Sequence, residues 1–258
     1  MTTADFSWRR AIATYADRRL WAIFVLGCSS GFPWVLISSA LSGWMKDIDL
    51  PRATISFIGS VTILYAVNFV WAPLVDRVHL PMLQRKLGQR RSWILLMQLS
   101  IVIGALGLSF SEPTLSLTMV ILWSTFIAAS AATMDVAIDG YRIDIVANET
   151  EKLPAAAAMS VAGWWTGYSL PGFAAFFLAD QYGWNTMYQL LAGALLGLSL
   201  VTLLLKEPST NRDMLQQKAA ERYQTSKKHP ALLWLTVTIV EPFAEFVRRN
   251  GVLLSVLL

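Results

Sequence analysis

Residues 115–144 read L-S-L-T-M-V-I-L-W-S-T-F-I-A-A-S-A-A-T-M-D-V-A-I-D-G-Y-R-I-D, an uncharged run that ends in a cluster of charges. The uncharged part has about the 20 residues that a helix needs to cross a bilayer. Asp135 and Asp139 lie four residues apart and Arg142 follows three residues later, so a helix would place them on one face. Because a charge at the end of a membrane helix is costly unless it is paired or reaches water, this stretch predicts a functional charged site.

The rest of the chain is similarly apolar. Of its 258 residues, 55% are hydrophobic and only 15% are charged, whereas a soluble domain carries about 25% charged residues. Six stretches are long and apolar enough to span a membrane as helices, namely 20–44, 54–75, 93–110, 115–138, 155–179 and 184–205. We therefore predict an all-α integral membrane protein.

The six predicted helices form one unit that is flanked by polar or mixed segments. We assign residues 1–19 to an N-terminal tail, 20–205 to a six-helix bundle and 206–230 to a polar central loop. Residues 231–250 hold charges that would be costly at depth, so we expect an amphipathic segment at the membrane surface. The apolar residues 251–258 are too few to span a bilayer, so we expect a fragment that ends within a seventh helix.

Basic residues are concentrated in every second connection between the predicted helices. Four Lys or Arg residues lie in the tail, five between helices two and three, two between helices four and five, and six in the central loop. The opposite connections hold only Lys46 and Arg52. Because loops rich in Lys and Arg stay in the cytoplasm, we predict that both ends of the chain lie on the cytoplasmic side.

The sequence offers no pattern of a metal site, a cofactor site or a catalytic set. Its single cysteine, Cys28, excludes an intrachain disulfide, and with only His79 and His229 there is no His/Cys constellation for a metal. Nucleotide fingerprints, phosphate loops and nucleophile motifs are absent from it. The net charge of +4 comes from the residues that flank the helices, so it does not indicate nucleic acid. We expect no enzyme activity, no cofactor and no nucleic-acid partner.

The connection between the second and third helices carries a distinctive set of charges. Asp76 and Arg77 end the second helix, and Arg90 and Arg91 open the third. Basic residues on the cytoplasmic side would explain the arginines alone, but not the placed aspartate, so we favour a conformational lock. We expect acidic residues of the fourth helix to pair with these arginines when an inner gate is closed. The predicted gate and charge relay comprises Asp76, Arg77, Arg90, Arg91, Asp135, Asp139 and Arg142.

Several segments, taken in chain order, resemble one transporter family. They are S-S-G-F-P from Ser29, L-S-G-W-M from Leu41, F-V-W-A-P-L-V-D-R from Phe69, G-Q-R-R-S-W from Gly88, A-A-T-M-D-V-A-I-D-G-Y-R-I-D from Ala131, G-W-W-T-G-Y from Gly163, G-W-N-T-M-Y from Gly183 and P-F-A-E-F-V-R-R-N-G from Pro242. Together they resemble the AmpG muropeptide permease family of the major facilitator superfamily, from about Ser29 to the last residue.

The resemblance implies a six-helix N-terminal half of a major-facilitator-type transporter in the bacterial inner membrane. It implies import of anhydro-muropeptides for cell-wall recycling, driven by the proton gradient. Protons, a muropeptide-like solute and the lipid bilayer would be the partners. Members of the family continue with a second half, which is absent from this chain.

This chain departs from the family pattern at two positions. The family commonly has Gln where Met134 stands and Arg where Ser169 stands. Both lost side chains are natural partners for amide, sugar and carboxylate groups. The departures leave the transporter prediction intact and weaken the muropeptide prediction, so carriers of an acetyl-CoA-like, sugar or peptide solute remain alternatives. A further alternative is a non-transporting half-carrier that acts as a sensor or scaffold.

Glycines, a proline and deep aromatic residues mark a possible substrate path. Pro33 removes a backbone donor in mid-helix, and broken helices at membrane depth can line a cavity. Adjacent helical side chains point about 100° apart, so we expect only one of Trp164 and Trp165 to face a cavity, and favour Trp165 with Tyr168. The predicted path residues are Ser29, Gly31, Pro33, Tyr65, Asn68, Trp165 and Tyr168.

The depth of the acidic residues decides which of them could carry a proton. Asp135 follows Leu115 by 20 residues, about 30 Å of helix, which places it near the cytoplasmic limit of the hydrocarbon. That depth fits a gate better than a carrier site in mid-membrane. Asp135 is nevertheless the better proton candidate, because it is the one that we expect to be partly buried.

Overall fold

The computed structural model describes residues 14–78 and 80–208. The amphipathic segment and the start of a seventh helix that the sequence predicts, and nearly all of the central loop, therefore lie outside the described residues. What is described is helical throughout, without a strand. In chain order the elements are α2 (Arg18–Trp34), η1 (Val35–Ser39), α3 (Ala40–Asp47), α4 (Arg52–Gly59), η2 (Ser60–Thr62), α5 (Ile63–Val67), η3 (Asn68–Val70), α6 (Ala72–Arg77), α7 (Pro81–Leu87), α8 (Gln89–Ser109), α9 (Leu117–Ile145), η4 (Thr150–Lys152), α10 (Leu153–Tyr182) and α11 (Trp184–Leu204).

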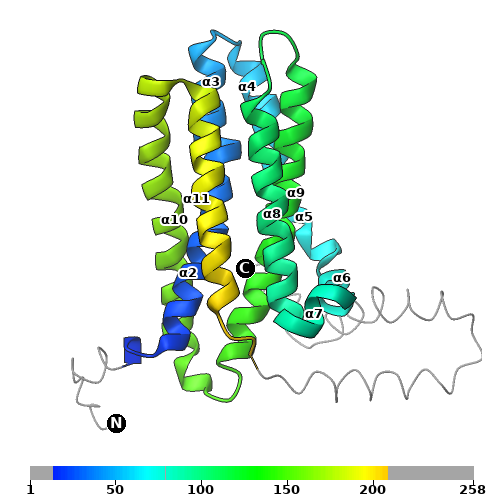
Figure 1. Cartoon of the computed structure of the whole chain (residues 1–258), viewed down its shortest axis with the longest axis vertical. Coiled ribbons are helices and arrows are strands. Elements are labelled where there is room, and N and C mark those ends of the chain that lie inside the picture. Colours follow the sequence, from blue (N-terminus) through cyan, green and yellow to red (C-terminus); the bar gives the residue numbers. More distant parts are fainter. Residues whose placement is uncertain (1–13, 79, 209–258) are drawn as a thin grey trace, which may run out of the picture.

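The long helices run side by side as one bundle (Figure 1). Five helical segments in the described residues are long and apolar enough to cross a membrane, namely Arg18–Asp47, Arg52–Val70, Gln89–Ser109, Leu117–Ile145 and Trp184–Leu204. The sixth long helix, α10, packs along α2 and α11, and its middle is rich in glycine and aromatic residues, which lower its mean hydropathy. The predicted all-α membrane architecture is confirmed.

One end of the bundle collects the charges that the sequence analysis singled out. At this end α2, α8 and α10 begin and α9 and α11 end, and the short helices α6 and α7 lie beside it (Figure 1). We call it the basic end, because its elements carry Arg18, Arg19, Arg85, Lys86, Arg90, Arg91 and Lys152.

Close backbone contact between α2 and α10 brings these two helices together. A Cβ atom on Gly31 would lie 2.1 Å from the carbonyl oxygen of Trp164, and one on Gly167 would lie 2.1 Å from that of Cys28. Gly27 and Gly163 meet backbone atoms in the same way. Small residues are therefore required here, as is usual where membrane helices approach closely.

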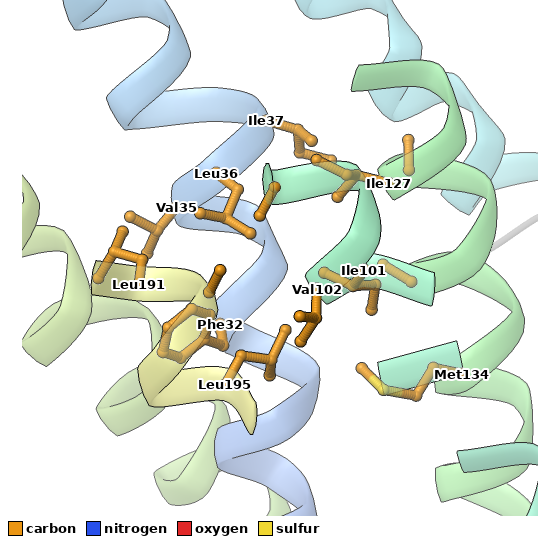
Figure 2. Close-up of a cluster of buried hydrophobic side chains, with 14 of the residues drawn as sticks. Phe32, Val35, Leu36, Ile37, Ile101, Val102, Ile127, Met134, Leu191 and Leu195 are labelled. Atoms are coloured by element: carbon orange, nitrogen blue, oxygen red, sulfur yellow. The ribbon is translucent and has the colours of Figure 1, made fainter. Parts of the chain in front are cut away.

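An apolar core fills the space between α2, η1, α8, α9 and α11. Figure 2 shows Phe32, Val35, Leu36 and Ile37 of the first span facing Ile101, Val102, Ile127, Met134, Leu191 and Leu195. Because lipid tails are as apolar as these side chains, the core stabilises the bundle through close packing rather than through the hydrophobic effect.

Pro33 does not break the first span. It is buried inside α2, and the helix continues through a π-helical turn, Val35–Ser39, into α3. Single π-helical turns inside helices are frequent at functional sites. The irregular step therefore lies one turn beyond the proline.

The fourth span is longer than the sequence indicates. The apolar run predicts an end at Ile138, but α9 continues to Ile145. Asp135 thus lies ten residues before the end of the helix, about 15 Å along its axis, rather than close to that end. The helix continues because its acidic side chains find partners within the bundle, so the first charge does not end it.

The glycine contact gives a matched pair of mutations. Gly31→Ala and Gly167→Ala should each lower the stability of the bundle by about 1–3 kcal/mol, the usual cost of overpacking, because the new methyl group meets backbone that cannot move aside. Gly193→Ala and Gly197→Ala on α11 should be neutral, since nothing lies within 4 Å of their Cβ positions. Melting temperatures of the purified variants measure the difference, and equal losses at all four glycines would contradict it.

Candidate functional site

A cavity of about 230 Å³ with a mixed polar and apolar lining lies between α2, α9 and α10. It is lined by Ser30 of α2, by Asp135, Ile138 and Asp139 of α9, and by Ser160, Val161 and Trp164 of α10. Three helices thus contribute two carboxylates, two hydroxyls and an indole ring to one space.

Asp135 is held by a hydroxyl group across the helix interface. The Ser30 hydroxyl donates a 2.7 Å hydrogen bond to Oδ1 of Asp135. No cation pairs with Asp135 among the residues that the structure describes. A carboxylate in a membrane bundle with a hydroxyl as its partner is costly when charged, so this position favours a group that can take up a proton.

Asp139 has a different environment, although it lines the same cavity. Its carboxylate lies 2.9 Å from the guanidinium of Arg142, three residues further along the helix, and its side chain is 61% exposed. The structure therefore brings Asp139 and Arg142 together, as their shared face predicts. The carboxylate of Asp139 thus forms an ion pair, whereas that of Asp135 has only a hydrogen bond from a neutral hydroxyl.

The indole ring of Trp164 lines the cavity and is supported by other aromatic rings. It stacks on Tyr168 with ring centroids 5.5 Å apart and planes 15° apart. Trp34 also meets it edge-on at 6.1 Å and packs on Tyr65 at 4.7 Å. Trp165, which the sequence analysis favoured over its neighbour, is 57% exposed and does not line the cavity. The rotation of about 100° between adjacent residues turns Trp164 inward instead.

Ser30 rather than the predicted Ser29 lines the cavity, again a difference of one residue. Ser29 is fully buried on the other side of α2, where its hydroxyl accepts a 2.9 Å hydrogen bond from Nε2 of Gln98. The same amide group donates to the hydroxyl of Thr202. Ser29 therefore links α2 to α8 and α11, while Ser30 reaches the cavity.

The other predicted path residues have structural contacts. Gly31 and Pro33 are buried where α2 meets its neighbours. Asn68 donates a hydrogen bond to the carbonyl oxygen of Ala132 on α9. The hydroxyl of Tyr65 is buried, with no hydrogen-bond partner in the part of the chain that the structure describes.

A separate cluster of charges lies at the basic end. Arg90 is nearly fully buried and pairs with Asp76 of α6 and with Asp144 of α9, the latter at 3.3 Å. Gly140 makes room for it, since a Cβ atom there would lie 2.2 Å from Cζ of the arginine. One guanidinium thus joins α6, α8 and α9.

Arg91 and Glu207 link the start of α8 to the end of α11. Nη2 of Arg91 donates to the carbonyl oxygen of Leu203 at 2.5 Å, near the end of α11. The carboxylate of Glu207 accepts from the backbone N–H groups of Arg90 and Arg91, at 2.8 and 3.2 Å, at the start of α8. A carboxylate at a helix N-terminus and a cation at a C-terminus both suit the helix dipole. The Tyr141 hydroxyl adds a 2.7 Å bond to the carbonyl oxygen of Lys206.

This cluster differs from the predicted gate in its acidic partner. Arg90 pairs with Asp76, a contact that was not predicted, and with Asp144 of α9 rather than with Asp135 or Asp139. The side chain of Arg77 lies outside the described residues. Asp144 could have been found as the last acid of the 135–144 stretch, four residues beyond Gly140. Glu207 carries no comparable signal in the sequence.

Comparisons with known proteins identify the family. The family model described as Major Facilitator Superfamily matches residues 23–258. The anhydromuropeptide permease of Escherichia coli (strain K12) is 31% identical over 237 residues, which cover 92% of this chain and 44% of the permease. The putative transporter AmpG 4 of Rickettsia conorii is 28% identical over 243 residues, 93% of this chain and 55% of the relative.

An uncharacterized protein of Haemophilus influenzae is 30% identical over 231 residues, which cover 89% of this chain and 49% of that protein. The chain thus spans about half the length of the curated relatives that it matches. Relatives with the AmpG and permease names confirm the resemblance that the motifs indicate. The chain is therefore a multi-pass bacterial membrane protein that belongs to the major facilitator superfamily.

Proposed function

We propose that this protein is a non-enzymatic secondary transporter of the bacterial inner membrane that imports anhydro-muropeptides with the proton gradient. The observation that carries the proposal is the cavity between α2, α9 and α10, which combines carboxylates, hydroxyls and a stacked tryptophan. Such a mixture suits a solute with hydroxyl and amide groups on apolar rings. The name of one relative, the anhydromuropeptide permease of Escherichia coli, supports the choice of solute.

The two departures from the family pattern bear on this solute. Met134 is buried in the apolar core and does not line the cavity (Figure 2). Ser169 is exposed and is also outside the cavity lining. Neither substitution removes a group from the lining of this cavity, so neither counts against a muropeptide at this site. A half-carrier without transport, acting as a sensor or scaffold, would not need this cavity.

We place the basic end in the cytoplasm, because the connections there hold most of the Lys and Arg residues. The relatives are about twice as long as the chain, so the proposed carrier includes a second half that completes the solute path. In that arrangement the cavity would open toward the second half, on the side where Asp139 and Val161 are exposed.

Different acidic residues serve proton coupling and gating. Asp135 carries the proton, since it has a hydroxyl partner and lies well inside the bundle. Asp76, Arg90 and Asp144 form the inner lock, since one guanidinium joins three helices. Asp135 and Asp139 would reach the arginines only in another conformation of the carrier. Arg91 stabilises the lock by holding the end of α11.

The solute is tested by uptake. The complete carrier, with this chain and the proposed second half, expressed in cells that lack their own anhydromuropeptide permease, should restore accumulation of labelled anhydro-muropeptide. Collapse of the proton gradient should abolish this accumulation. The same cells with an empty vector are the control. Absence of uptake from cells in which the protein reaches the membrane would contradict the proposed solute.

Replacement of the proton carrier should separate coupling from movement of the solute. Asp135→Asn should abolish accumulation against a gradient and leave solute exchange measurable, because the amide keeps the hydrogen bond to Ser30 but cannot take up a proton. Asp49→Asn, the same change at the opposite end of the bundle, should have no effect. If uptake by Asp135→Asn still follows the gradient, Asp135 is not the proton carrier.

The lock can be opened without removing a charge. Gly140→Ala should displace the guanidinium of Arg90, because the new methyl group would lie 2.2 Å from its Cζ atom. We expect a several-fold fall in the initial rate of uptake. A similar fall is expected for Arg90→Lys, because Arg90 reaches Asp144 and Asp76 through two separate nitrogens, Nε and Nη1, and lysine has a single nitrogen at its tip. The double variant should be no worse than either single variant, because both remove the same interaction. Additive losses would show that Gly140 acts elsewhere.

A further inference from the structure

Four charged side chains at the basic end close a ring of ion pairs. Arg19 pairs with Asp17 at 2.8 Å and with Glu149 at 2.6 Å. Lys152 pairs with the same two carboxylates, again at 2.8 and 2.6 Å. Positive and negative charges therefore alternate around a closed ring. We call these four residues, Asp17, Arg19, Glu149 and Lys152, the charge ring. Networks of this kind contribute more than isolated surface pairs.

The charge ring joins parts of the chain that are far apart in sequence. Asp17 is the N-cap of α2, where its side chain also accepts a 2.9 Å hydrogen bond from the backbone N–H of Arg19. Glu149 and Lys152 lie in the connection between α9 and α10. The ring therefore fastens the start of α2 to the point where α9 and α10 are joined.

The same three helices enclose the cavity. Ser30 contributes from α2, Asp135 and Asp139 from α9, and Trp164 from α10. Both α9 and α10 pack mainly on other helices, α10 against α2 above all, and touch each other little. The cavity lies between them and α2. At the basic end, a small apolar cluster that includes Leu20 and Val146 packs α2 against the end of α9 and the start of α10. The spacing of α9 and α10 there therefore depends on this cluster, on their connection and on whatever holds that connection in place.

We propose that the charge ring is a staple that fixes the spacing of α9 and α10 at the basic end, and with it the width of the cavity. The staple lies apart from the lock around Arg90, which joins α6, α8 and α9 but touches neither α2 nor α10. Release of the ring lets α10 and α9 separate and widens the cavity for a bulky solute. Only this last step rests on the proposed function.

The ring stays ionised over the pH range of the cell. Hydrogen bonds from Arg19, and then from Lys152, lower the pKa of Glu149 to about 2 and hold the pKa of Asp17 well below its usual range. Both carboxylates raise the pKa of Lys152. A carboxylate with a lowered pKa keeps its stabilising effect above its ordinary pKa and loses it only as the pH falls toward the lowered value. The staple therefore responds to ionic strength rather than to the proton gradient.

The spacing can be measured directly by electron paramagnetic resonance on the full chain in lipid nanodiscs. Cys28→Ser removes the single cysteine, and spin labels at Ile143→Cys on α9 and Ala157→Cys on α10 occupy exposed positions. With the ring intact, the distance distribution should be narrow. Arg19→Gln and Glu149→Gln should each lengthen it by several ångströms and broaden it, and the double variant should be no wider than either single variant.

Two matched variants serve as controls. Arg18→Gln removes a neighbouring exposed charge that makes no ion pair among the described residues, so it should leave the distribution unchanged. Lys152→Arg keeps the charge and should keep the distance distribution narrow. A narrow distribution in this variant would show that a substitution in the ring does not by itself widen the distribution through misfolding. Salt at about 1 M, which shortens the Debye length to about 3 Å, should widen the distribution of the intact ring and leave the ring variants as they are.

The proposal is overturned if Arg19→Gln leaves the distances unchanged, or if Arg18→Gln shifts them equally. Because no solute is present in this measurement, its failure is distinct from failure of the uptake assay. A wider spacing in a protein that imports no anhydro-muropeptide would keep the staple and reject the solute.

Discussion

Close backbone contact between α2 and α10 is the constraint from which the candidate site follows. Gly31 lies against the carbonyl group of Trp164, and Gly167 lies against that of Cys28. With the two backbones this near, the residues beside the contact have little freedom in direction. Ser30 and Trp164 are therefore held at the edge of the space that α9 closes from the other side. Larger side chains at the glycines would move both cavity walls.

The need to satisfy charges within a membrane bundle then orders the residues of α9. Asp135, the deepest of its acids, is met by the hydroxyl of Ser30; Asp139 is met by Arg142, and Asp144 by the buried Arg90. Along α9, toward its C-terminal end, the partner of the carboxylate changes from a neutral hydroxyl to a buried arginine. A proton can neutralise the first carboxylate, whereas the last is neutralised by its arginine. The chemistry of one helix thus supports two separate roles.

The sequence predicts the architecture well because its strongest signal is the length of apolar runs. Six of them correspond to six long helical segments. Asp76 and Arg90 were both named as candidate gate residues, but their pairing with each other was not predicted. The end of α9 was missed, since a run of apolar residues stops at the first charge although the helix need not stop there. For the same reason Asp144, which lies beyond the predicted end at Ile138, was not named as a partner of Arg90.

The remaining differences depend on rotation and on distant packing. In two pairs of adjacent residues, Ser29 and Ser30 and Trp164 and Trp165, the sequence predicted the wrong member to face the cavity. Adjacent side chains on a helix point about 100° apart. Periodicity alone cannot determine which of two neighbouring polar or aromatic residues faces a cavity when the two sides of a membrane helix differ little in polarity. Glu207 reaches the start of α8 only because α11 ends beside it, and no local pattern carries that information.

The two charge clusters at the basic end share one element, and this has a mechanical consequence. The lock holds α9 through Asp144, and the charge ring holds the connection that follows it through Glu149. Any displacement of α9 along its axis therefore strains both clusters. The same displacement would also move Asp135 relative to Ser30, because a helix without an internal break moves as one body. Protonation of Asp135 and opening of the basic end would then be coupled through α9 itself. In the proposed mechanism such coupling would be reciprocal, so a change that loosens the pairing of Arg90 with Asp144 would also change the proton affinity of Asp135.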